Sequence, residues 1–135
     1  MPLARHAMHL AREDIHVALW PTVHEMHQVA SRQYAFEGRC YVLACGGLQR
    51  AAALPEGLEA EPARVDSPQA LVQRGGSAVI GPDGSYVVEP VFDEPALLVT
   101  TIDPGRCVEE RMTLDVAGHY GRPDVFDFAV RSGRR

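Results

Sequence analysis

The sequence contains no lysine, because all 13 of its basic side chains are arginines. No residue can therefore supply a side-chain ammonium, and an arginine guanidinium is not an equivalent donor. The sequence also has no long run of basic residues, and the net charge is −5. Because phosphate binding needs a concentrated positive surface, the composition argues against nucleic acid as a partner.

Long apolar segments and paired cysteines are absent as well. No apolar run is long enough to span a membrane, and the N-terminus does not read as a secretory signal, so we expect a cytoplasmic protein with no membrane partner. The cysteines Cys40, Cys45 and Cys107 form no C-x-x-C pair, which indicates neither a disulfide framework nor a zinc ribbon. Cys40 and Cys45 lie in an apolar segment, where a thiol is expected to be buried and unreactive.

The sequence of 135 residues, 46% of them hydrophobic, is long enough for one modest domain. Apolar periodicity predicts that helices and strands alternate along it. We expect helices at 2–14, 22–38 and 104–112. We expect strands at 15–20, 40–45, 77–80, 85–88 and 96–103, and a last extended piece at 125–130. The strands at 77–80 and 85–88 are expected to form a hairpin, with Gly81-Pro82-Asp83-Gly84 as its turn. The result is a mixed α/β fold whose strands need cover on both faces.

The expected helix at 22–38 has the clearest start signal in the sequence. Thr22 followed by Glu25 has the spacing of a capping box, and Gly38 is suited to end the helix. One apolar face is expected to comprise Met26, Val29, Ala30 and Tyr34.

The stretch VHEMHQ at the start of this helix is close to a zinc motif. The motif H-E-x-x-H places two histidines four residues apart, but here the required position holds Gln28 and the histidines His24 and His27 are three apart. No third ligand is obvious, since the other histidines are scattered. We therefore predict no metal site and interpret these residues as surface or pocket-lining histidines, with a metal site as the less favoured alternative.

Other catalytic motifs are missing too. The sequence has neither a G-x-S-x-G elbow nor a Walker loop, and Gly75-Gly76-Ser77 is better explained as a turn before a strand. The carboxylates of Asp115, Asp124 and Asp127 lie among turn-forming residues, which is typical of solvated loops. Catalytic patterns alone therefore identify no active site.

Segments spread along the chain nevertheless resemble a known family. These are MPLAR at 1–5, IHVALWPTVHEMHQVASRQYAFEGRCYVLACG at 15–46, GGSAVIGPDGSYV at 75–87 and DVAGHYGRPDVFDFAV at 115–130. In this order they resemble the C-terminal half of a nitrilase, a member of the carbon-nitrogen hydrolase superfamily. The resemblance implies that residues 1–135 form part of a four-layer αββα sandwich, with a variable surface excursion at about 47–74, and that the protein forms homo-oligomers.

The resemblance also implies a chemistry. In this family a cysteine thiolate attacks the carbon of a nitrile or amide, a glutamate acts as general base, and a lysine stabilises the intermediate, without a cofactor. The family's cysteine directly precedes the segment that resembles residues 1–5. All the catalytic residues would thus lie upstream, and the absence of lysine agrees with this. We expect the chain alone to be inactive.

The resemblance further implies that Trp20, Pro21 and Thr22 reach toward the substrate, with His24 nearby. Trp20 could instead be a core residue and Thr22 only a helix cap. Arg32 and Glu37 match family positions that brace helix against strand. The implied activity is conversion of a small organic nitrile, or an amide, to a carboxylic acid and ammonia. The alternative is a non-catalytic remnant that acts as a binding or oligomerisation module, with the tail from Asp115 onward as its contact surface.

Overall fold

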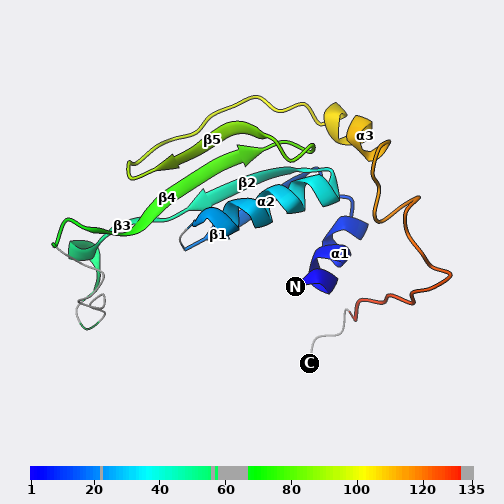
Figure 1. Ribbon diagram of the computed structural model, residues 1–135, viewed down its shortest axis with the longest axis horizontal. Coiled ribbons are helices and arrows are strands. Elements are labelled where there is room, and N and C mark those ends of the chain that lie inside the picture. Colours follow the sequence, from blue (N-terminus) through cyan, green and yellow to red (C-terminus); the bar gives the residue numbers. More distant parts are fainter. Residues whose placement is uncertain (22, 56, 58–66, 132–135) are drawn as a thin grey trace.

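The computed structural model describes residues 1–21, 23–55, 57 and 67–131. It confirms the alternation of helices and strands. The strands form one mixed sheet, and a long helix packs against it (Figure 1). The helices are α1 (Pro2–Leu10), α2 (Glu25–Gly38) and α3 (Gly105–Arg111), with a short 3₁₀ turn, η1, at Ala51–Ala53. The strands are β1 (Ile15–Trp20), β2 (Tyr41–Gly46), β3 (Leu48–Arg50), β4 (Leu71–Ile80) and β5 (Tyr86–Phe92).

The strands are ordered around β4, which is the longest of them. β1 runs parallel to β2, with α2 as the crossover between them, and β2 runs antiparallel to β4. β3 continues along the same edge of β4 after β2 ends, and β5 pairs with the other edge. Because parallel neighbours need a crossover connection, the β1–α2–β2 unit follows directly from the sequence order.

The core lies between α2 and the sheet. Its buried members are Ala35, Cys40, Val42, Ala44 and Ile80, and Ala18, Trp20, Tyr34 and Tyr86 pack against them. The alanines let the helix approach the strands closely, so the contact is dense although the side chains are small.

The predicted apolar face of α2 is not its buried face. The buried residues of this helix are Gln28, Ser31 and Ala35, whereas Met26 and Val29 are exposed. The buried polar groups are tolerated because each is hydrogen-bonded, Gln28 to Gly76 and Ser31 to Trp20. The first helix is shorter than the expected 2–14, because α1 ends at Leu10, and its buried residue is His9.

The start of α2 differs from the expected capping box. The N-cap is His24, whose backbone N–H donates to Nδ1 of His27 at 3.1 Å. Glu25 is the first helical residue, where a carboxylate interacts favourably with the helix dipole. Thr22 lies outside the described residues.

The turn predicted at 81–84, which directly follows β4, is confirmed. Gly81 N–H donates to Ser85 O at 2.8 Å, and Gly84 adopts a φ of +79°, which favours glycine. The hairpin is longer than expected, since β4 begins at Leu71. The expected excursion at 47–74 therefore contains β3, η1 and the first residues of β4, while 56 and 58–66 lie outside the described residues.

The strand expected at 96–103 does not form. This segment has no strand pairing, and Leu97 is 90% exposed. It runs from β5 back to α3 as an extended connection (Figure 1). Its Leu, Val and Thr content favours a strand, but a strand also needs a neighbour to accept its backbone hydrogen bonds.

One face of β1 is left uncovered among the described residues. The side chains of His16, Ala18 and Trp20 are half-buried on the side of α2, whereas Ile15, Val17 and Leu19 on the opposite side are 44%, 54% and 77% exposed. We call this second set the open face. No helix of the described residues is long and apolar enough to cross a bilayer.

Candidate functional site

The ends of β1 and β2 meet the start of α2 at one end of the sheet. Gly47 N–H donates to Trp20 O at 3.2 Å, and Gly75 N–H donates to Gly47 O at 2.9 Å, so three chain segments are joined here. The carboxyl ends of parallel strands are the usual place for ligands in α/β sheets. We call this region the β1–β2 end.

Trp20 occupies the centre of the β1–β2 end. Its indole N–H donates to Ser31 Oγ at 3.3 Å, and its ring lies edge-on to His27 with the centroids 4.8 Å apart. These contacts give Trp20 a packing role against α2. That it also contacts substrate stays a prediction.

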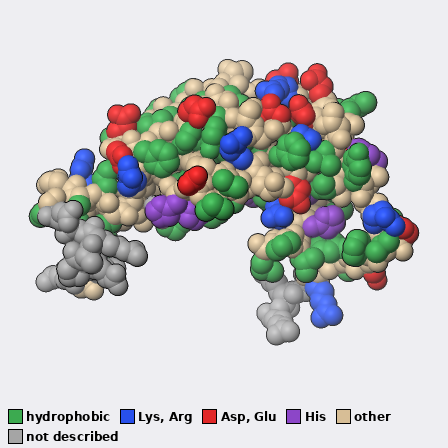
Figure 2. All heavy atoms as spheres, viewed as in Figure 1, with side chains coloured by type: hydrophobic (Ala, Val, Ile, Leu, Met, Phe, Trp, Pro, Cys, Tyr) green, Lys and Arg blue, Asp and Glu red, His purple; other side chains and the backbone are tan. Residues whose placement is uncertain are grey.

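The two histidines of the VHEMHQ stretch lie together beside Trp20. Their ring centroids are 5.6 Å apart, and Figure 2 shows histidine side chains at the surface where α2 begins. Because His27 Nδ1 accepts the His24 N–H, the neutral His27 ring carries its proton at Nε2 and can donate from there. Within the described ranges, no group of three or more His, Cys, Asp or Glu side chains could hold a metal ion.

The structure thus brings together most of the expected pocket residues. Trp20, Pro21 and His24 lie at the same end of the sheet, with Pro21 and His24 exposed. Thr22, between them, lies outside the described residues. Their contact with substrate is a prediction that the geometry leaves open.

Gln28 is a residue of this region that the sequence patterns did not single out. Its side chain is buried, with Nε2 donating to Gly76 O at 2.8 Å and Oε1 accepting from the Tyr86 hydroxyl at 3.1 Å. One amide therefore joins α2 to β4 and β5. The only sequence signal for its burial is the helical spacing of Gln28 from Ser31 and Ala35, which lie three and seven positions later on the same face of α2. This signal is weak because Gln28 is polar.

Glycines let the strands approach one another at the β1–β2 end. A Cβ on Gly46 would lie 2.0 Å from the Gly75 carbonyl oxygen, and Ser77 Oγ accepts the Gly46 N–H at 3.0 Å. Gly75 and Gly76 have φ values of +82° and +88° inside β4, where the pairing with β5 shifts register. The interpretation of Gly75-Gly76-Ser77 as a turn before a strand is therefore wrong, because these residues form an irregularity within the strand.

Arg32 and Glu37 each connect α2 to another element. Arg32 Nε donates to Gly84 O at 2.8 Å, and its guanidinium lies 5.1 Å from the centre of the Tyr86 ring. Glu37 lies 2.7 Å from Arg5 Nε of α1. The Arg32 contacts are compatible with the expected bracing of helix against strand, whereas the Glu37 contact joins two helices. The bracing role of both residues stays a prediction.

The chain is similar to known proteins over most of its length. Residues 1–112 match the family model described as carbon-nitrogen hydrolase. The chain belongs to the carbon-nitrogen hydrolase family. A nitrilase of Pseudomonas syringae pv. syringae (strain B728a) is 39% identical, over 92% of this chain and 40% of the relative. Nitrilase 2 of an unknown prokaryotic organism is 36% identical, over 100% of this chain and 41% of the relative.

A solved structure agrees on the fold of this carbon-nitrogen hydrolase chain. A CN-hydrolase superfamily protein from Xanthomonas campestris superposes with a TM-score of 0.57 at 24% identity, covering 87% of this chain and 37% of the other. The described chain is thus a partial fragment of that α/β fold. It spans about 40% of the length of the nitrilases that it matches.

The thiols of this carbon-nitrogen hydrolase chain differ in exposure. Cys40 and Cys107 are buried. Burial raises the pKa of Cys40 to about 12, and it also raises the pKa of Cys107 above its usual value. Cys45 is exposed, so the expectation that it is buried is wrong. Its position pairs with Leu19, on the open face.

We expect iodoacetamide to modify Cys45 in the folded protein and to modify Cys40 and Cys107 only after unfolding, because the thiolate is the reactive form. Peptide mass spectrometry of native and urea-unfolded samples measures this, and the unfolded sample is the control for reagent access. Equal modification of all the cysteines in the native sample would contradict the placement.

Proposed function

We propose that this chain is the C-terminal part of a nitrilase-type hydrolase that converts a small organic nitrile, or an amide, to a carboxylic acid and ammonia. The observation that carries the proposal is the 39% identity to a nitrilase over 92% of the chain. The chain covers only 40% of that relative, so the proposal concerns a larger protein to which these residues contribute.

The open face supports the view that a second sheet completes the fold. Ile15, Val17 and Leu19 point away from α2 and are 44%, 54% and 77% exposed. Complete burial of a fully exposed side chain of this kind stabilises a fold by about 1.5–3 kcal/mol, so covering the open face would add a part of that free energy for each residue. In a four-layer αββα sandwich a second sheet covers this face. We assign that sheet to upstream sequence of the same protein.

The reaction needs groups that this chain does not supply. A cysteine thiolate adds to the nitrile carbon to form a thioimidate, water converts this to a thioester with release of ammonia, and a second water releases the acid and regenerates the thiol. The sequence has no lysine to stabilise the intermediate, so we assign the cysteine, glutamate and lysine to the upstream part. No cofactor is proposed.

The contribution of this chain is then one wall of the pocket. Trp20 ends β1, and Pro21 and His24 precede α2. We assign the substrate-facing surface to these residues together with Thr22. The Trp20 indole and the Nε2 proton of His27 offer an apolar surface and a donor side by side, which suits a small polar group on an organic substituent.

A second candidate function is that of a non-catalytic module that binds other copies of the same protein. For both candidates we propose that the complete protein is a homo-oligomer. The tail favours this candidate because its large apolar side chains are exposed: Tyr120, Val125, Phe126 and Val130. The same exposed side chains are compatible with an oligomeric hydrolase. A measurement of hydrolase activity therefore distinguishes the two candidate functions.

The test is ammonia release from a panel of small nitriles, together with the intact mass of the native protein. We expect a mass of roughly twice the 14.8 kDa of this chain or more, with ammonia release, and no ammonia from the 135-residue chain alone. The control is the longer protein with its upstream cysteine replaced by alanine, which should fold and release no ammonia. A native mass of 14.8 kDa without activity would favour the binding module.

A further inference from the structure

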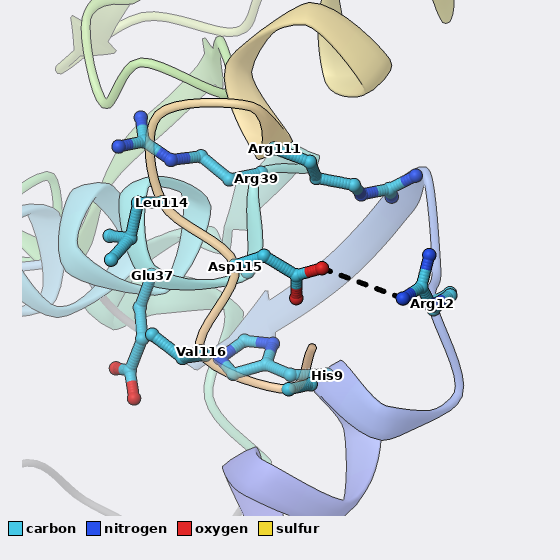
Figure 3. Close-up of a pocket in the computed structure, with 10 residues that line it drawn as sticks. His9, Arg12, Glu37, Arg39, Arg111, Leu114, Asp115 and Val116 are labelled. Carbon is cyan, nitrogen blue, oxygen red and sulfur yellow. Dashed lines mark hydrogen bonds and ion pairs between the residues drawn. The ribbon is translucent and has the colours of Figure 1, made fainter. Parts of the chain in front are cut away.

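A small polar cavity lies away from the β1–β2 end, where α1, the end of α2 and residues 114–117 meet. Its volume is about 10 Å³. Its charged or titratable lining residues are His9, Arg12, Glu37, Arg39, Arg111 and Asp115. Figure 3 shows His9 of α1 lying beneath the segment that carries Asp115, with Arg39 and Arg111 above it in this view.

His9 is the buried polar group of this cavity. Its side chain is only 4% exposed, and neither Nδ1 nor Nε2 has a hydrogen-bond partner among the described residues. The ring is fixed in place, since it lies 4.7 Å from the Tyr34 ring and a Cβ on Gly38 would lie 2.5 Å from its Nδ1. An unsatisfied buried polar atom costs about 1–3 kcal/mol, so a partner is expected.

Each ring nitrogen needs its own partner, an acceptor for the N–H and a donor for the other nitrogen, and a water molecule can serve in either role. Burial is the main cause that lowers the pKa of His9, so the ring is neutral near pH 7, with one N–H donor and one acceptor nitrogen. Arg39 Nε is a second buried donor without a partner in the described part of the chain. The cavity thus offers both kinds of hydrogen-bonding group.

The surrounding charges are already paired, which excludes an ionic ligand. Arg12 lies 3.4 Å from Asp115, Arg39 lies 3.2 Å from Glu110, and Arg111 lies 2.9 Å from Asp14. A cation would be repelled by the charges of these arginines, and a phosphate ion is far larger than the cavity. A volume of about 10 Å³ is close to the smallest that holds one water molecule.

We propose that this cavity is a binding site for a single structural water molecule, which bonds to the His9 ring and joins α1 to residues 114–117. A buried water makes about three hydrogen bonds to groups that are otherwise unsatisfied. His9 supplies one of them, and the polar atoms of Arg39 and Asp115 line the same cavity. The water would stabilise the packing of the C-terminal segment on α1.

The direct test is a crystal structure of the protein at a resolution that shows ordered water. We expect a density peak about 3 Å from a His9 ring nitrogen and from a polar atom of another element. A map without that peak, or one in which protein atoms bond both ring nitrogens, overturns the proposal.

The second test compares His9→Gln with His9→Leu, because these side chains have similar size and differ in polarity. If the water is bound, the glutamine can bond to it, and the leucine variant should unfold with an equilibrium constant about tenfold larger. If the cavity holds no water, the order reverses, because the glutamine amide is then buried without a partner. His6→Gln and His6→Leu on the same helix are the matched controls, since His6 is only half-buried. If neither His9 variant folds, the crystal map decides.

Discussion

Replacing Gly46 with alanine is expected to destabilise the protein by about 3 kcal/mol, at the upper end of the usual cost of overpacking. The added Cβ would lie 2.0 Å from the Gly75 carbonyl oxygen and 2.7 Å from its carbonyl carbon. These are backbone atoms of β4, so no side-chain rotation relieves the clash. The strands must separate where β2 passes into β3, at the β1–β2 end.

Urea unfolding followed by the fluorescence of Trp20 measures this effect, because Trp20 is the only tryptophan of the sequence. Gly105→Ala is the matched control. Its added Cβ would lie 3.0 Å from a side-chain oxygen of Asp103 at the start of α3, and alanine is favoured over glycine in a helix by about 0.5–1 kcal/mol. Equal stability of the Gly46 variant and the wild type would contradict the close approach of the strands.

The 135-residue chain expressed alone is expected to self-associate. The open face exposes Ile15, Val17 and Leu19 on a strand at the edge of the sheet, and both apolar surface and unpaired strand edges favour association. Sedimentation velocity over a range of concentrations measures this. A monodisperse monomer that unfolds cooperatively would count against it.

A charge on the open face should weaken this association. Val17→Asp is expected to lower the association constant by at least about tenfold, because burying an unpaired carboxylate in an apolar contact costs more than about 1.4 kcal/mol. Val108→Asp on α3 is the control, since Val108 is similarly exposed but lies off the sheet. An equal effect of the two substitutions would show that the open face is not the surface involved.

Local patterns predicted much of the chain correctly. The apolar run 15–20 is β1 over the same residues, and the Gly81-Pro82-Asp83-Gly84 sequence forms the expected turn. The family could be recognised from segments in order, and the family model agrees. These features depend on residues that are close together in the sequence, so they can be predicted from the sequence alone.

Other features depend on groups that are distant in the sequence. Gln28 faces the sheet because Gly76 and Tyr86 bond its amide, and periodicity cannot show that. Residues 96–103 have strand propensity but no pairing, and Gly75-Gly76 lie inside β4 rather than in a turn. In each case the local structure depends on whether another element of the fold provides a hydrogen-bonding partner.

The sequence by itself determined the family, the order of the main elements and the lack of lysine, because these features depend only on residue types and their spacing along the chain. Only the tertiary structure decided which face of β1 is covered. The side chains of a strand alternate between two faces, and the position of α2 makes His16, Ala18 and Trp20 the inner set and leaves Ile15, Val17 and Leu19 open.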